Sequence, residues 1–265
     1  NLEYIIIDGG STDGSVEIIM KYEQWLTHWV SEKDSGQSHA INKGFTRSTG
    51  EIIAWLNSDD YYAPNIFSLI AQKFQDSNWV VGETHIVDKD RNLIEVSQPR
   101  NNSKVDLDAC FKNGNRFDFS VSQPGHFWSN DLIKKVGLLN EKYHFCMDRE
   151  WMTRALAFNE HPVYLDKLIA YQRYQPESKT SLMLWAFDLD KANLYKDLAF
   201  RGVLYFLPAI RLYREHASRG YRAYSDLLFS ENTKIRSLVF ALWGLILSRG
   251  KKGKGFFSRV TRVFK

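Results

Sequence analysis

The sequence lacks several features that define whole classes of protein. Its 265 residues include only two cysteines, Cys110 and Cys146, which are too few for a disulfide framework and fit a reducing compartment. No apolar run reaches the roughly 18 residues that a transmembrane helix requires. The glycine-rich patterns GxxxxGK(S/T) and GxGxxG are both missing. Any phosphate group would therefore have to be held in another way, and a metal ion is the simplest candidate.

The bulk composition indicates a globular protein with an uneven charge. Hydrophobic residues make up 44% of the chain and aromatic residues 14%, which is enough to bury a large core. The net charge is +4, but residues 201–265 contain 14 Lys and Arg against three Asp and Glu, so the preceding part is acidic. An acidic body with a basic tail predicts that the tail contacts an anionic surface.

The first two-thirds of the chain alternate between strand and helix periodicities. Leu2–Asp8 is typical of a buried strand, and a Gly-rich turn and apolar residues at helical spacing from Ile18 to Trp29 follow it. This order predicts a βα unit. Further predicted elements are a polar segment at Ser31–Gly44 and strands at Glu51–Leu56, Trp79–Val81 and Thr84–Val87. Helices are predicted at Asn65–Phe74, started by Pro64, at 131–140, ended by Gly137, and at Arg149–Phe158. We expect an α/β domain over residues 1–180 and a helical region over residues 181–265.

Two adjacent carboxylates, Asp59 and Asp60, lie where an apolar strand ends in the segment AWLNSDDYY. Ligands of open α/β sheets bind at such strand ends. Two hard oxygen ligands suit a divalent cation that keeps most of its water and also binds a diphosphate. The alternative is an ordinary turn, because Asn, Ser and Asp are common turn residues.

A third acidic position, Asp148, lies at the entry of a predicted helix in CMDREWMTR. It could act as a helix N-cap, which is a common role for Asp. It could instead accept a proton from an attacking hydroxyl in the cleft that contains the carboxylate pair. Glu150 is an alternative on the surface of the same helix.

Six stretches together resemble glycosyltransferase family two, the inverting group with the GT-A fold that includes bacterial cell-surface polysaccharide enzymes. They occur in the order and spacing of that family and cover residues 1 to about 181. The stretches are Glu3–Ser15, Ser31–Phe45, Gly50–Tyr62, Gln123–Trp128, Val136–Arg154 and Arg173–Ser181. The resemblance implies a Rossmann-like mixed sheet flanked by helices. It also implies transfer of a sugar from a nucleoside-diphosphate sugar to a hydroxyl of a glycan or lipid-linked acceptor.

The resemblance assigns a role to each matching position. Asp60 would coordinate Mg²⁺ or Mn²⁺, Asp59 would contact the ribose or the metal's shell, and Asp148 would be the general base. Nucleotide contacts are implied for Asp8, Asp34 and Asn42, donor-sugar and acceptor contacts for Gln123, His126 and Trp128, and closure over the diphosphate for Arg173, Ser178 and Lys179.

Several positions depart from the pattern of the family. Gly9 stands where many relatives have a second acid, and His39 stands where Asp is frequent. Asn57 replaces the leading acid of the longer DXDD form, and Gln175 replaces a frequent His. Relatives also have one further βα unit ahead of the segment that begins here, so we expect that the chain is truncated at its N-terminus. These departures keep open a non-catalytic nucleotide-sugar-binding or scaffold protein. A nucleotidyltransferase shares the fold class, but its usual glycine-rich phosphate loop is not visible.

Aromatic residues and His126 also have purely structural interpretations. We expect Trp151 in the core, whereas for Trp128 a core position and stacking on a sugar are equally favoured. For His126, the role of a hydrogen-bonded structural residue is favoured over that of a metal ligand.

The C-terminal region combines a short apolar run with many cations. Leu238–Leu247 is too short to cross a membrane, and the following residues alternate basic side chains with Phe and Val. This pattern predicts peripheral contact with an anionic bilayer, at the cytoplasmic face of the cell membrane. The alternative is a core helix with a solvated tail, and no nucleic-acid partner is expected.

Overall fold

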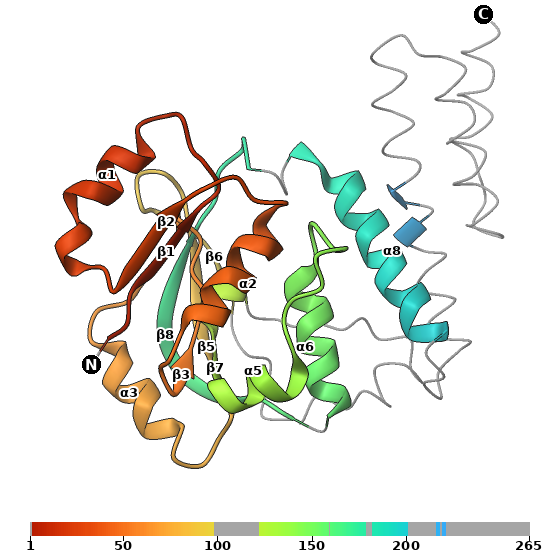
Figure 1. Ribbon diagram of the computed structural model, residues 1–265. Helices are drawn as coiled ribbons and strands as arrows, with labels where there is room; N and C mark the ends of the chain where they lie inside the picture. The colour runs from red at the N-terminus through yellow and green to blue at the C-terminus, as the bar shows by residue number, and fades with distance from the viewer. Residues whose placement is uncertain are drawn as a thin grey trace, which may run out of the picture. The chain divides into compact units, whose positions relative to one another are not determined.

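The computed structural model describes residues 2–97, 122–158, 160–178 and 182–200, together with 216, 217, 219 and 220. The chain divides into two compact units. Among the described residues, the first unit extends to Gln175 and the second begins at Pro176. The predicted boundary was residue 180. Figure 1 shows the helices and strands of the described residues in chain order.

The first unit opens with a small parallel sheet. Strand β1 (Ile5–Asp8) pairs with β2 (His28–Ser31), with Ile6 opposite Trp29 and Asp8 opposite Ser31. Between them lie helix α1 (Ser15–Lys21) and the 3-10 helix η1 (Glu23–Trp25). Helix α2 (Gln37–Arg47) follows β2 and packs on β1. The polar ends of both strands therefore lie at one edge.

The second sheet of this unit has six strands. Its members are β3 (Ile52–Ile53), β4 (Tyr61–Tyr62), β5 (Trp79–Val87), β6 (Leu93–Ser97), β7 (His126–Ser129) and β8 (Val163–Arg173). Their order is β3-β7-β5-β8-β4, and β6 pairs with β5. Strands β5 and β8 are parallel, whereas β4 is antiparallel to β8. This pairing joins the segment after Asp60 to the segment that ends at Arg173.

Helices cover both faces of the six-stranded sheet. Successive side chains of a strand point to opposite faces. Val80 therefore packs with Ile66 and Ile70 of α3 (Ile66–Lys73), whereas its neighbour Trp79 faces the other way. The indole of Trp128 lies on this second side, edge-on to Trp151 of α6 (Met147–Ala157), and α5 (Asn130–Val136) packs on β7. Burial from both faces explains the apolar start of β5.

Several predicted elements differ from the observed ones. The helix predicted to reach Trp29 ends at Lys21, because Trp29 pairs with β1 in a strand. The polar segment Ser31–Gly44 contains most of α2. The strand predicted at Glu51–Leu56 is limited to Ile52–Ile53. The two short strands predicted between Trp79 and Val87 are one strand, β5, whose register against β8 shifts next to Gly82.

Other local signals were confirmed. Helix α3 follows Pro64, and α5 ends at Gly137, which has a φ of 86° that favours glycine. Gly82 has a packing role, since a Cβ there would lie 2.8 Å from the side chain of Ile169. Trp151 is fully buried, as expected. Short-range chemistry was thus sufficient for these elements.

The second unit is helical where it is described. Helix α8 (Leu184–Phe200) contains Asp188, whose carboxylate pairs with His216 at 2.8 Å. Tyr195 stacks on the same imidazole. Within the described parts of the chain, no helix has the length and hydropathy that crossing a membrane requires. The basic segment after Leu247 lies outside the described residues.

Candidate active site

The Asp59–Asp60 pair lies in the turn that leads into β4. The backbone N–H of Arg173, at the end of β8, donates to Asp60 Oδ1 at 3.0 Å. The amide of Asn57 donates to Asp60 Oδ2 at 3.2 Å. Gln175 donates from Nε2 to Asp59 Oδ2 at 3.2 Å. The end of β8 thus contacts both carboxylates.

Asp60 is buried with few donors around it. Asp60 is only 8% exposed to solvent. Burial raises the pKa of Asp60 from 3.8 to about 6, and the nearby charge of Asp59 acts in the same direction. A cation stabilises a buried carboxylate of this kind more than it stabilises a carboxylate exposed to water.

Asp148 lies in the first turn of α6, and Cys146 occupies the cap position instead. Asp148 is partly exposed, and its Oδ1 accepts from the N–H of Arg149 at 2.8 Å. The loop ahead of it is anchored on the first turn of α2. There Ser38 donates to the carbonyl of Tyr143 at 3.1 Å, and a Cβ on Gly36 would touch the ring of His144.

The first turn of α2 also reaches the carboxylate pair. Gln37, the first residue of α2, donates from Nε2 to Asn57 Oδ1 at 2.7 Å. Asn57 in turn contacts Asp60. One helical turn therefore contacts both the Asp60 turn and the loop that precedes Asp148, which places the two predicted centres in one region of the unit. No local pattern pointed to Gln37, because α2 itself was not predicted.

Asp8 and Asp34 lie at the ends of β1 and β2. Asp8 accepts hydrogen bonds from Gly10, Ser11 and Ser31, and the two serine hydroxyls lower the pKa of Asp8 to about 2. Asp34 Oδ1 accepts from the N–H of Gly36 at 2.8 Å. A Cβ on Gly9 would lie 2.6 Å from Asp34 Oδ2, so a second acid at position 9 would require Asp34 to move.

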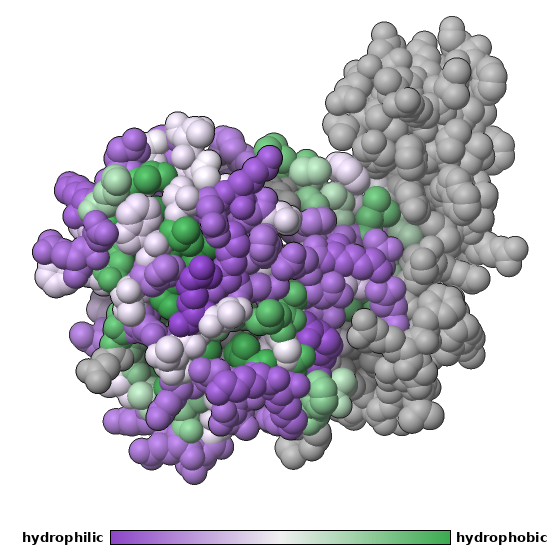
Figure 2. Space-filling model, in the orientation of Figure 1, coloured by the Kyte–Doolittle hydropathy of each residue, from purple (hydrophilic) through white to green (hydrophobic). Residues whose placement is uncertain are grey.

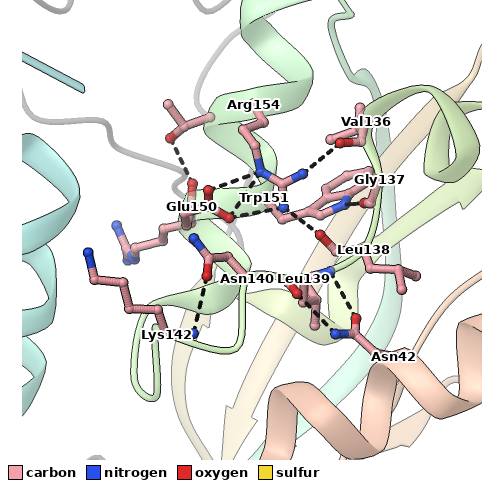
Figure 3. Close-up of polar contacts among 12 residues, drawn as sticks. Asn42, Val136, Gly137, Leu138, Leu139, Asn140, Lys142, Glu150, Trp151 and Arg154 are labelled. Atoms are coloured by element: carbon pink, nitrogen blue, oxygen red, sulfur yellow. Dashed lines mark hydrogen bonds and ion pairs between the residues drawn. The ribbon is translucent and has the colours of Figure 1, made fainter. Parts of the chain in front are cut away.

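Asn42, predicted to line the nucleotide pocket, is instead buried against a loop (Figure 3). Its Oδ1 accepts from the N–H of Leu139 at 2.9 Å, and its Nδ2 donates to the carbonyl of Leu139 at 3.0 Å. The same Nδ2 contacts Glu141. Both ends of the amide are used by the protein, so the nucleotide-binding prediction for Asn42 is wrong in this structure.

The prediction that Glu150 lies on the helix surface is also wrong. It is 4% exposed, and Arg154 donates to both of its carboxylate oxygens from Nε and Nη2. Arg154 extends to the carbonyl of Val136, the last residue of α5, and to that of Leu138 just after it, as Figure 3 shows. The ion pair lies within α6, and the bonds from Arg154 to the two carbonyls join α6 to the end of α5. A buried, paired carboxylate of this kind is not available to a substrate.

Of the three predicted contact residues between Gln123 and Trp128, His126 and Trp128 are buried and Gln123 is half-buried. Trp128 is fully buried and stacks on Trp55 at 4.6 Å, so the alternative of stacking on a sugar is wrong. His126 is 2% exposed and accepts from Trp79, which agrees with a structural role and not with substrate contact. Gln123 donates to the carbonyl of Trp55, while its Oε1 has no partner among the described residues.

The closing segment is only partly described. Arg173 ends β8, and its Nε is buried without a hydrogen-bond partner in the described part of the chain. Ser178 belongs to the second unit, and Lys179 lies outside the described residues. Within the first unit, Arg173 contacts Asp60 through its backbone N–H.

The face that carries α2 and α6 is polar over most of its area. Figure 2 shows it as largely hydrophilic, with hydrophobic residues in small separate patches. A surface of this kind suits a hydrated, charged ligand better than an apolar one.

Solved structures similar to this chain include proteins bound to nucleotide sugars. S. aureus TarS (residues 1–349), solved with UDP-GlcNAc, aligns at a TM-score of 0.58 and 15% identity, over 98% of this chain and 73% of that chain. A mannosyltransferase from Pyrobaculum calidifontis, solved with GDP-Man and Mn²⁺, aligns at a TM-score of 0.52 and 13% identity, over 98% and 70%. The fold is therefore the GT-A fold, as predicted.

Sequence comparison defines the family. Residues 1–160 match glycosyl transferase family 2, and the chain belongs to this family. An uncharacterized glycosyltransferase of Nostoc sp. is 29% identical over 144 residues, which are 51% of this chain and 44% of that protein. One from Rickettsia typhi is 30% identical over 187 residues, which are 68% and 57%. The chain thus spans about half the length of these curated relatives.

Proposed function

We propose that this domain transfers a sugar from a nucleoside-diphosphate sugar to a hydroxyl of a glycan or lipid-linked acceptor, with inversion, in cell-surface polysaccharide synthesis. The observation that carries the proposal is the turn in which Arg173 and Asn57 orient the buried Asp60 carboxylate beside Asp59. The family and the fold support a nucleotide-sugar donor, since TarS was solved with UDP-GlcNAc and the mannosyltransferase with GDP-Man.

The donor set fits a magnesium or manganese ion. Asp59 and Asp60 supply two hard oxygen ligands. Among the described residues no group of three or more His, Cys, Asp or Glu side chains could hold a metal by itself, so a cation at this pair would depend on ligands from outside the protein. Such a cation would keep several waters and take its remaining ligands from the diphosphate. When bound, it would neutralise the negative charge of the departing nucleoside diphosphate.

Asp148 is the proposed general base. Its carboxylate is partly exposed in the first turn of α6, where it can reach an acceptor hydroxyl. It would take the proton from that hydroxyl as the oxygen attacks the anomeric carbon from the side opposite the diphosphate. A single displacement of this geometry inverts the configuration at that carbon.

The Asp148→Asn variant tests the enzymatic assignment. We expect it to fold normally, to bind donor as the wild type does, and to lose roughly 10²- to 10⁴-fold in transfer rate. Donor panels of UDP- and GDP-sugars, with product detection by mass spectrometry, provide the assay. Transfer at the wild-type rate would remove Asp148 as base, and a wild type that only binds donor would favour a scaffold.

We also propose that residues 201–265 contact the anionic inner face of the cell membrane. Their excess of Lys and Arg supports this proposal. Flotation with anionic liposomes, compared between the chain and a variant without residues 235–265, tests it. Equal partitioning of the two would contradict it.

A further inference from the structure

A chain of side-chain amides leads from α2 to the Asp60 carboxylate. Nε2 of Gln37 donates to Oδ1 of Asn57 at 2.7 Å, and Nδ2 of Asn57 donates to Oδ2 of Asp60 at 3.2 Å. The backbone is tied in the same way, since the N–H of Asp60 donates to the carbonyl of Asn57 at 3.1 Å. Asn57 therefore holds Asp60 through both its side chain and its main chain.

The chemistry of the groups fixes the direction of this chain. An ionised carboxylate only accepts hydrogen bonds, so Asn57 must turn its NH₂ group toward Asp60. Its Oδ1 then faces Gln37, and Gln37 must present its own NH₂ group. Each amide orientation is thus determined by the next group and not by an arbitrary assignment of nitrogen and oxygen.

We infer that Asn57 is a positioning residue for Asp60, and that Gln37 fixes the direction in which Asn57 donates. The inference rests on the proposed cation-binding role of Asp60. Its other oxygen, Oδ1, is held from the opposite side by the N–H of Arg173. With both oxygens held, the carboxylate keeps one orientation, and outer hydrogen bonds of this kind tune metal ligands.

An isosteric change at Gln37 tests the direction directly. In Gln37→Glu the new carboxylate can only accept, so Asn57 is expected to turn its NH₂ group toward that carboxylate and to present Oδ1 to Asp60. Gln37 is exposed and opens a helix, where Glu is tolerated, so the variant should fold. The probe is Mn²⁺ with inorganic pyrophosphate, measured with the full chain by EPR of free Mn²⁺.

We expect Q37A to weaken the affinity about 3-fold, and Q37E and N57A about 10-fold each. The Q37E/N57A double variant should bind no more weakly than N57A alone, because the amide that transmits the change is then missing. Gln24→Ala, at an exposed amide in η1, is the matched control and should stay within about 2-fold of the wild type.

Three results would overturn the inference. Affinity of Q37E within about 2-fold of the wild type would show that Gln37 does not orient Asn57. If Q37E weakened the affinity as much in the N57A background as in the wild type, the loss would come from the added negative charge and not from the orientation of Asn57. A wild type that does not bind Mn²⁺ with pyrophosphate would instead remove the cation role of Asp60, and the inference with it.

Discussion

Two aspartates at strand ends, Asp8 and Asp60, have the same chemistry and opposite surroundings. Asp8 is the last residue of β1 and accepts from two backbone amides and two serine hydroxyls, which lower its pKa to about 2. Asp60 precedes β4 and accepts from Arg173 and Asn57 only, and burial raises its pKa to about 6. The protein thus supplies four hydrogen bonds to the negative charge of Asp8, whereas it supplies only two to the buried carboxylate of Asp60.

Under the proposed function, this difference distinguishes Asp60, which would bind a cation, from Asp8, which the protein itself satisfies. Asp8 was predicted to contact the nucleotide, as the family resemblance implies. Asp60 was predicted to bind a cation, from its position where an apolar strand ends and from the same resemblance. The structure indicates that Asp8 closes the turn from Gly10 to Ser11 and ties it to β2 through Ser31. Asp60 gains most from a bound cation, because its ionised form is otherwise poorly compensated.

The largest expected effect in this comparison comes from Asp60→Asn. Loss of a cation ligand should weaken the affinity for Mn²⁺ with pyrophosphate by at least about 100-fold, more than loss of an outer partner does. The free energy of unfolding at pH 7 should stay equal to or above that of the wild type, because the buried charge itself costs on the order of 3 kcal/mol. EPR titration and urea unfolding measure the two quantities.

A variant that kept its metal affinity while becoming less stable would reverse the comparison. Asp60 would then be a structural carboxylate like Asp8. The control is Asp8→Asn, which should bind Mn²⁺ with pyrophosphate within about 2-fold of the wild type, since Asp8 lies in a different turn and sheet.

A smaller effect is expected from pH. The folded pKa of Asp60, about 6, lies above its unfolded value of 3.8, so the folded state of the free protein loses stability as pH rises from about 4 to about 6. A cation needs the ionised form, so its affinity should fall about 10-fold per pH unit below 6 and stay level from about 6.5 to 7.5. Titrations at pH 5, 6 and 7.5, corrected for protonation of free pyrophosphate, provide the measurement.

Asp8→Asn should show the same pH profile as the wild type, because the pKa of Asp8 is far below this range. A flat profile in the wild type would mean that Asp60 is ionised throughout and is not distinguished from Asp8 by its burial.

Local sequence signals predicted some elements well. Pro64 marks the start of α3 and Gly137 the end of α5, because both residues restrict or permit particular backbone angles. Strand β2 was missed since Trp29 continues the helical spacing of α1. Its strand conformation depends on pairing with β1, which lies more than twenty residues earlier. Helix α2 was also missed, because its sequence is mostly polar.

The candidate site shows a similar division. Motif and spacing led to Asp59, Asp60 and Asp148. They also led to Asn42, Trp128 and Glu150, whose partners are Leu139, Trp55 and Arg154. Those partners come from distant segments or from the packing of two helices, and no local pattern reveals whether a polar group is already satisfied. Gln37 and the contact of Asn57 with Asp60 were missed for the same reason, whereas Arg173 was among the predicted site residues.

The smallest expected effect is on stability, from Asp8→Asn. The folded pKa of Asp8, about 2, lies below the ordinary 3.8, so its hydrogen bonds stabilise the folded state above about pH 4 and this contribution is lost as pH falls toward 2. An amide has only one accepting oxygen for the four donors. We expect a loss of about 1–2 kcal/mol at pH 7, after allowance for screening by solvent. Urea unfolding at pH 7 and pH 3 should show the difference from the wild type shrinking at the lower pH. Asp13→Asn, in the fully exposed turn nearby, is the matched control and should change stability less. If both variants were equally stable, the bonds to Ser11 and Ser31 would not distinguish Asp8 from any solvated aspartate, and Asp8 would again be a candidate for contact with the donor.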